Sequence, residues 1–201
     1  MMDYIKSLIW VDYFYYTLVE PRRLINIITK EEKKTLPLSI SVVAAVSIIE
    51  IITISLLGKE DLFFYYKITY GWILAFFILS LIIAITASLV DLACQIRGYN
   101  GNAKNIINVI IFSLFPRIFL LPIVIIFKVL HFAPIFFYLF SSILVFIWQA
   151  LIIIQGISEI HRISFAESVM IFLSPIIFIS AILFFSLFLI IINISGYISL
   201  L

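Results

Sequence analysis

Residues 72–94 read WILAFFILSLIIAITASLVDLAC, and Asp91 carries the only charged side chain among them. A bilayer core about 30 Å thick is crossed by roughly 20 consecutive apolar residues in helical form. Inside lipid each backbone N–H and C=O group needs a hydrogen-bond partner within its own segment, so a lone stretch of this kind forms a helix. Residues 72–94 therefore predict a transmembrane helix.

Four other segments share this length and composition. The five predicted spans are residues 36–57, 72–94, 106–130, 134–155 and 169–193. Apolar residues make up 65% of the 201-residue chain and charged residues 12%, against about 45–50% and about 25% in soluble domains. A soluble protein of this length could not bury so much apolar surface. The sequence predicts an all-α, polytopic transmembrane bundle of five spans, residues 36–201, as one domain.

The first 35 residues predict an amphipathic helical segment at the membrane interface. Residues 3–20 mix charged and aromatic side chains, and Pro21 opens a second short amphipathic stretch. Such segments lie in the plane of the membrane surface with one apolar side. Two interpretations stay open for residues 1–35: a surface anchor, or a docking site for a cytosolic partner.

Proline and glycine positions refine the predicted spans. Pro116 and Pro122 lie inside the third span and Pro175 lies inside the fifth, so kinks are expected at these residues. The six glycines, Gly156 included, fall at or beyond the predicted helix ends, where the chain reverses.

Lysine and arginine counts predict the orientation of the chain. Nine of these residues lie in the N-terminal segment and the two loops on its side of the membrane, and three lie on the other side. Cytoplasmic loops are enriched in Lys and Arg. We therefore expect a cytoplasmic N-terminus and an external C-terminus. The Ile- and Phe-rich composition favours a prokaryotic cell membrane, with an ER or Golgi membrane as the alternative.

The sequence contains no recognisable catalytic or metal-binding pattern. His131 and His161 are predicted on opposite sides of the membrane, and Cys94 is the only cysteine. These residues cannot supply a transition-metal ligand set. A net charge of +2 also gives no reason to expect a nucleic-acid partner. We expect no enzyme activity and no cofactor.

Glu50 and Arg117 are ionisable residues inside the predicted spans, where charges are costly and mark paired or functional positions. At 1.5 Å per residue, they lie roughly 21 Å and 16 Å from the N-terminal side. An arginine side chain bridges such a difference in depth, so the two can pair if the first and third spans touch. The pair is interpreted either as structural or as part of a substrate or proton pathway in a transporter or channel component. Gln149 is expected to make an interhelical hydrogen bond.

The loop predicted after the fourth span also has two interpretations. Its candidate docking residues are Gly156, Glu159, His161, Arg162 and Ser164. These residues form either a docking surface for a partner or a capped turn between two helices. In the capped turn, Ser164 is the N-cap and Glu167, three residues later, completes a capping box.

Three parts of the chain carry a resemblance to a known family. They are residues 148–151 (WQAL) with 156–164 (GISEIHRIS), Ala166 and Pro175; Gly98 and Gly101 followed by 112–116 (FSLFP); and 21–23 (PRR) before the first span. With them the chain resembles the Yip family of Ypt/Rab-interacting membrane proteins, over nearly its whole length. The 156–164 run is the most specific part.

The resemblance implies a five-span domain with a cytoplasmic N-terminus, which agrees with the charge count. Eukaryotic members associate with prenylated small GTPases and act in vesicle traffic. This chain lacks their acidic-aromatic D-L-Y-G-P motif and has a short N-terminal region, so it resembles the prokaryotic branch more closely. The expected function is a non-enzymatic membrane scaffold or accessory subunit that binds a protein partner, in a homo- or hetero-oligomer, at its cytoplasmic face.

Overall fold

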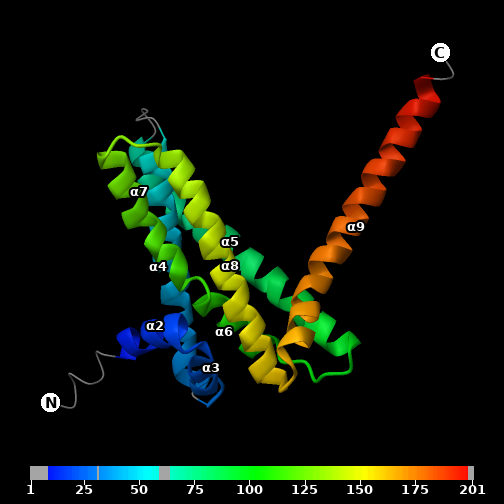
Figure 1. The fold of residues 1–201 in the computed structure, drawn as a ribbon, viewed down its shortest axis with the longest axis horizontal. Helices are drawn as coiled ribbons and strands as arrows, with labels where there is room; N and C mark the ends of the chain where they lie inside the picture. Colours follow the sequence, from blue (N-terminus) through cyan, green and yellow to red (C-terminus); the bar gives the residue numbers. More distant parts are fainter. Residues whose placement is uncertain (1–8, 31, 59–63, 199–201) are drawn as a thin grey trace.

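The computed structural model of the chain describes residues 9–30, 32–58 and 64–198 (Figure 1). All regular secondary structure in these residues is helical, which confirms the predicted all-α class. The helices are α2 (Ile9–Val19), α3 (Pro21–Lys30), α4 (Glu32–Leu57), α5 (Phe64–Ile96), α6 (Ala103–Phe112), the 3-10 helix η1 (Phe115–Phe119), α7 (Leu120–Val129), α8 (Pro134–His161) and α9 (Phe165–Ile198).

The helices supply five spans long and apolar enough to cross a membrane, as the sequence predicts. They are Pro37–Leu57, Phe64–Ile96, Ala103–Val129, Pro134–His161 and Phe165–Ile190. The second and fourth spans extend beyond the predicted bounds, 72–94 and 134–155. Backbone hydrogen bonds continue a helix whether or not its side chains are apolar, whereas composition marks only the part that lipid surrounds. The second and fourth spans were therefore predicted too short.

The third span is broken in its middle rather than gently bent. Residues Ser113 and Leu114 form a turn between α6 and η1, and the backbone N–H of Arg117 bonds to the carbonyl of Leu114 over 2.9 Å. Pro116 has no N–H to continue the α-helical ladder from α6. Pro122 lies in the first turn of α7, where a missing N–H costs nothing. The break coincides with Pro116 and places Arg117 on η1.

Pro175 lies inside α9, and the helix continues on both sides of it. The first part of α9 packs on the bundle, where Ile171 is fully buried. Beyond Pro175 the described side chains are exposed, and Figure 1 shows α9 diverging from α5 and α8. In a membrane this apolar surface is solvated by lipid.

The two short helices before the first span pack on one end of the bundle. Leu24, Ile25 and Ile28 of α3 are buried in the protein. In α2, Tyr13 stacks on Phe112 with ring centroids 5.5 Å apart. We call this end, with α2, α3 and the turns 97–102 and 162–164, the α3 face. The apolar side of α3 is thus covered by protein rather than by lipid.

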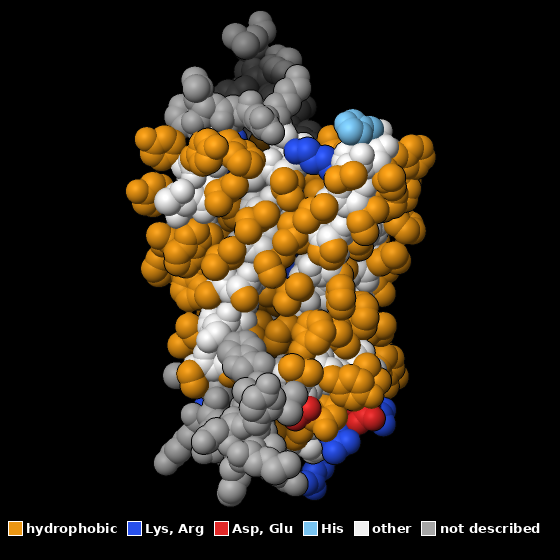
Figure 2. Space-filling view, turned by 90° about the vertical axis from the view of Figure 1, so that its left-hand side faces the viewer, with side chains coloured by type: hydrophobic (Ala, Val, Ile, Leu, Met, Phe, Trp, Pro, Cys, Tyr) orange, Lys and Arg blue, Asp and Glu red, His pale blue; other side chains and the backbone are white. Residues whose placement is uncertain are grey.

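The surface has an apolar middle and charged ends. Figure 2 shows hydrophobic side chains over most of the middle of the molecule, with Lys, Arg, Asp, Glu and His side chains gathered toward its two ends. This distribution is the one that a bilayer imposes on a protein that crosses it. The chain is a multi-pass membrane protein in contact with lipid.

Candidate functional site

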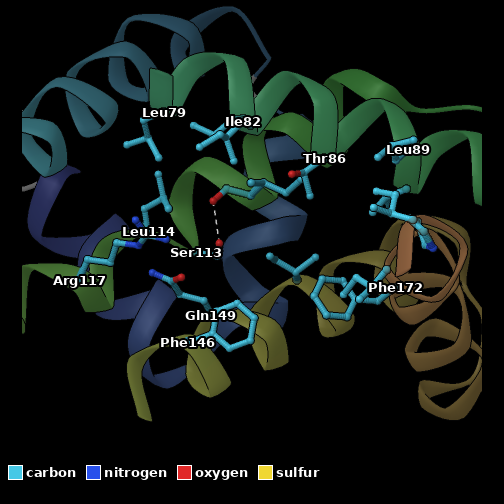
Figure 3. Close-up of a pocket in the computed structure, with 17 residues that line it drawn as sticks. Leu79, Ile82, Thr86, Leu89, Ser113, Leu114, Arg117, Phe146, Gln149 and Phe172 are labelled. Atoms are coloured by element: carbon cyan, nitrogen blue, oxygen red, sulfur yellow. Dashed lines mark hydrogen bonds between the residues drawn. The ribbon is translucent and has the colours of Figure 1, made fainter. Parts of the chain in front are cut away.

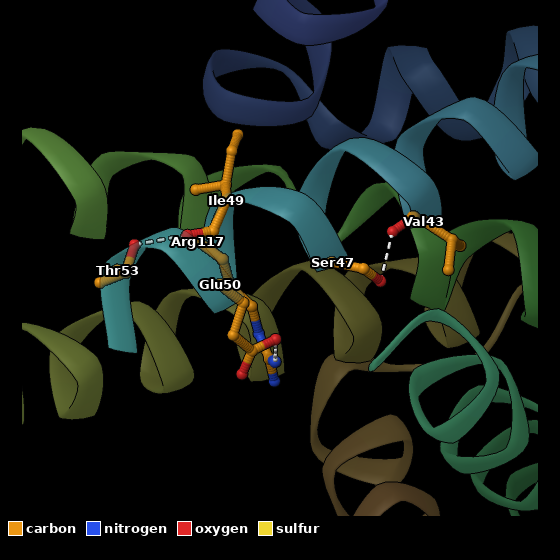
Figure 4. A network of polar contacts seen from close by, with 6 residues as sticks. All are labelled: Val43, Ser47, Ile49, Glu50, Thr53 and Arg117. Atoms are coloured by element: carbon orange, nitrogen blue, oxygen red, sulfur yellow. Dashed lines mark hydrogen bonds and ion pairs between the residues drawn. The ribbon is translucent and has the colours of Figure 1, made fainter. Parts of the chain in front are cut away.

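Glu50 and Arg117 face each other between α4 and η1 (Figure 4). Nη1 of Arg117 donates a hydrogen bond to Oε2 of Glu50 over 3.4 Å. Charge-assisted N–H···O bonds are commonly 2.7–2.9 Å long, so this one is loose. About a third of each side chain is exposed, 30% for Arg117 and 36% for Glu50. The guanidinium can therefore donate a hydrogen bond to a second partner in addition to Glu50.

The pair lines a cavity of about 540 Å³, which we call the ion-pair cavity. Its remaining walls come mainly from α8, where Tyr138, Ser142 and Gln149 lie on one side of the helix. These residues are four and seven positions apart in sequence, a spacing that repeats on one helix face. The ion-pair cavity thus combines a salt bridge with three polar side chains of one helix.

A second cavity, of about 290 Å³, lies between α5, α6, α8 and α9, and we call it the apolar cavity (Figure 3). It is lined mostly by aliphatic and aromatic side chains, and its polar lining residues are Thr86, Ser113, Arg117 and Gln149. Arg117, Phe146 and Gln149 line both cavities. The two cavities therefore adjoin at Arg117 and Gln149.

Gln149 is buried beside both cavities, in a setting that the sequence did not predict. Its side chain is 5% exposed, and its Nε2 atom has no hydrogen-bond partner among the described residues. An unsatisfied buried amide donor is costly, about 1–3 kcal/mol. The interhelical hydrogen bond expected for this residue does not form at Nε2. The spacing of Tyr138, Ser142 and Gln149 along the predicted fourth span was the signal that could have placed these three residues on one polar face.

The predicted loop after the fourth span is only partly a loop. Helix α8 continues to His161, so Gly156, Glu159 and His161 are helical, and only Arg162 and Ser164 lie in the turn to α9. Gly156 is buried, and a Cβ atom built there would lie 2.3 Å from Cγ1 of Val109. The prediction that all glycines mark helix ends is wrong for Gly156 and for Gly71, which lies inside α5. Small residues inside membrane helices let two backbones approach closely.

Ser164 caps α9, as one of the two interpretations of this turn expects. The backbone N–H of Glu167 donates to Oγ of Ser164 over 3.2 Å. The Glu167 carboxylate accepts a hydrogen bond from the hydroxyl of Tyr99. This bond raises the pKa of the Tyr99 phenol, because a carboxylate acceptor favours the protonated form.

Glu159 and Arg162 lie on the α3 face. Nε of Arg22, on α3, lies 3.3 Å from Oε1 of Glu159. Arg162 ends α8 in the left-handed conformation, with φ of 54°, and its side chain is exposed. The ion pair joins the N-terminal segment to α8, so the two parts of the chain that were candidates for partner binding share one surface.

His161 borders a polar pocket at the same face. The pocket is about 400 Å³ and is lined by residues 98–102 with Ile160 and His161. Nε2 of His161 has no partner among the described residues. His131 follows α7, whereas His161 ends α8, about 40 Å away along a 28-residue helix. In the described part of the chain no group of three His, Cys, Asp or Glu side chains gathers to hold a metal ion.

Comparison with known proteins gives one match. A family model described as Yip1 domain matches residues 15–188, which is most of the chain. No curated protein and no solved structure matches. The matched residues include α3, four complete spans and most of the fifth, the Glu50–Arg117 pair and most of the α3 face.

Proposed function

The chain belongs to the Yip1 domain family, and from that membership we propose a non-enzymatic membrane scaffold or accessory subunit that binds a protein partner. The binding surface is the α3 face, including Glu159, Arg162 and Ser164 at the end of α8 and the start of α9. We place this face in the cytoplasm of a prokaryotic cell, with the C-terminus outside, on the Lys and Arg count.

One observation carries the proposal: α3 is built into the protein rather than laid into lipid. Its apolar side chains are buried or partly buried, while Arg22 and Arg23 remain 71% and 61% exposed. Arg23 also lies over the ring of Tyr16, 4.7 Å from its centroid. A surface anchor would direct its apolar side outward. A fixed surface with exposed arginines suits recognition of a partner with acidic groups.

Affinity purification with mass spectrometry tests the proposal. The chain is solubilised in mild detergent as the wild type, as Arg23→Glu/Arg162→Glu on the α3 face, and as Lys128→Glu at the opposite end of the bundle. We expect one partner to co-purify with the wild type and with Lys128→Glu. The amount of this partner recovered with the double variant should be at least tenfold lower. A chain that purifies alone, or a partner retained equally by all three, would contradict the proposal. Thermal unfolding of each variant serves as the folding control.

A second candidate function is supported by the ion-pair cavity. A transporter or channel component would use Glu50 and Arg117 beside the broken third span, since discontinuous helices line many transport sites. In proteoliposomes, that function requires a flux that falls when Glu50→Gln and Arg117→Gln are introduced. The apolar cavity weakens this candidate, because aliphatic side chains adjoin the pair on the side of the α3 face.

A further inference from the structure

The ion-pair cavity and the apolar cavity form one amphiphilic space. Arg117, Phe146 and Gln149 line both, so the polar wall of the first continues into the apolar wall of the second (Figure 3). The apolar part follows α5 from Leu79 to Val90. At 1.5 Å per residue this is about 16 Å, or roughly half the thickness of a bilayer core.

The polar end offers hydrogen-bond donors. Nε2 of Gln149 is buried without a partner among the described residues, and the guanidinium of Arg117 has five N–H donors, of which the 3.4 Å contact with Glu50 engages Nη1. Two converging donors select a group with acceptor oxygens. Figure 3 shows the Gln149 amide and the Arg117 side chain on the same side of the apolar cavity.

The charge balance of the site selects a neutral ligand. Glu50 already neutralises Arg117, so an added anion would leave one net negative charge in the membrane, which is costly. A carbonyl oxygen supplies an acceptor without this charge. Glu50, Arg117 and Gln149 together therefore favour an ester over a carboxylate or a phosphate.

The apolar part has room for a portion of one chain and is open to lipid. At about 290 Å³, its volume is just below the range for ligand cavities, about 300 to 1,000 Å³, so the far end of a long chain extends into the bilayer. The wall residues Ile82, Phe146, Ile176 and Ile179 are also exposed on the membrane side of the bundle. A chain can thus enter sideways from the bilayer, beside the diverging helix α9.

We propose that the two adjoining cavities bind one molecule of a neutral single-chain lipid ester. Its carbonyl accepts hydrogen bonds from Gln149 and Arg117, and its hydrocarbon chain lies along α5 toward the α3 face. The site is distinct from the protein-binding surface and does not depend on it.

Photo-crosslinking in vesicles tests this site. The full-length protein is reconstituted in phosphatidylcholine vesicles with methyl palmitate that carries a diazirine near the middle of its chain, and labelled residues are mapped by mass spectrometry. We expect saturable labelling within residues 82–90 of α5 or 172–179 of α9. Gln149→Leu should raise the probe concentration that gives half-maximal labelling about three- to tenfold, the factor expected for one lost hydrogen bond. Gln155→Leu, on the same helix outside both cavities, should leave it unchanged.

Competition separates the ester from hydrocarbon in general. Unlabelled methyl palmitate should displace the probe, whereas hexadecane, which lacks the carbonyl, should do so at least threefold less well. Equal competition by hexadecane, equal labelling of Gln149→Leu, or the same labelling pattern from a diazirine phosphatidylcholine would overturn the proposal. Because leucine is apolar and similar in size to glutamine, Gln149→Leu should fold as the wild type does.

Discussion

Replacing Gly156 with leucine is expected to lower the free energy of unfolding by about 3 kcal/mol or more, at the upper end of the range for overpacked cores. Gly156 lies inside α8 against α6, and its Cβ position is 2.3 Å from Cγ1 and 3.0 Å from Cγ2 of Val109. Val109 is itself buried, so it cannot swing into open space. The two helices must separate to admit any side chain at residue 156.

The smaller change Gly156→Ala permits a rescue experiment. Alone it should cost about 1–3 kcal/mol, and Val109→Ala in the same chain should recover most of that loss. Gly71→Ala is the matched control, because its Cβ would meet Ile51 at an ordinary 3.6 Å. The measurement is unfolding of the detergent-solubilised protein in a titration with sodium dodecyl sulfate. Independent, additive effects of the two alanine substitutions would show that Gly156 and Val109 do not pack as described.

Replacing Arg117 with leucine is expected to cost about 2–4 kcal/mol. Removing one partner of a fully buried ion pair costs about 3–5 kcal/mol, because the other charge is left uncompensated. The lower range applies here since Glu50 and Arg117 are about one-third exposed. The single Glu50→Leu change leaves an uncompensated guanidinium and should cost a similar amount.

The double variant Glu50→Leu/Arg117→Leu should recover most of the stability lost in either single variant, since apolar replacements of buried pairs are often neutral. The same titration measures all three chains, with Lys128→Leu at the exposed end of α7 as a control. That change removes only an exposed hydrogen bond to the carbonyl of Leu56 and is expected to change stability by about 1 kcal/mol or less. If the two single losses simply add in the double variant, Glu50 and Arg117 do not interact energetically.

The fold could be predicted from sequence because the bilayer imposes strong constraints on length and composition. A run such as residues 72–94 has one plausible structure in lipid, and Pro116 marked the place where the third span breaks. The ends of the helices were harder to predict. Gly156 was interpreted as a helix end because glycine favours turns, whereas in α8 it is the small residue at a close helix contact.

The sites depend on which helix faces meet, and single-sequence reasoning does not supply that. Depth along the helices was enough to suggest that Glu50 and Arg117 lie at similar levels, and in the structure they are 3.4 Å apart. The contact of Arg22 with Glu159 joins residues 137 positions apart, and no local sequence pattern predicts it. Gln149 had a recognisable helical spacing with Ser142, but only the packing of α5, α8 and α9 reveals the cavity beside it.

Partner binding as proposed requires that the α3 face lie in the cytoplasm. The most direct test introduces single cysteines into a Cys94→Ser chain, which lacks the buried native thiol. One cysteine is placed between α5 and α6 and the other between α7 and α8. Asn100→Cys reports on the α3 face and Phe132→Cys on the opposite end; both residues are exposed. We expect a membrane-impermeant maleimide to label Phe132→Cys in intact cells and Asn100→Cys only after permeabilisation. Labelling of Asn100→Cys in sealed cells, with Phe132→Cys protected, would contradict this orientation and the proposed cytoplasmic partner.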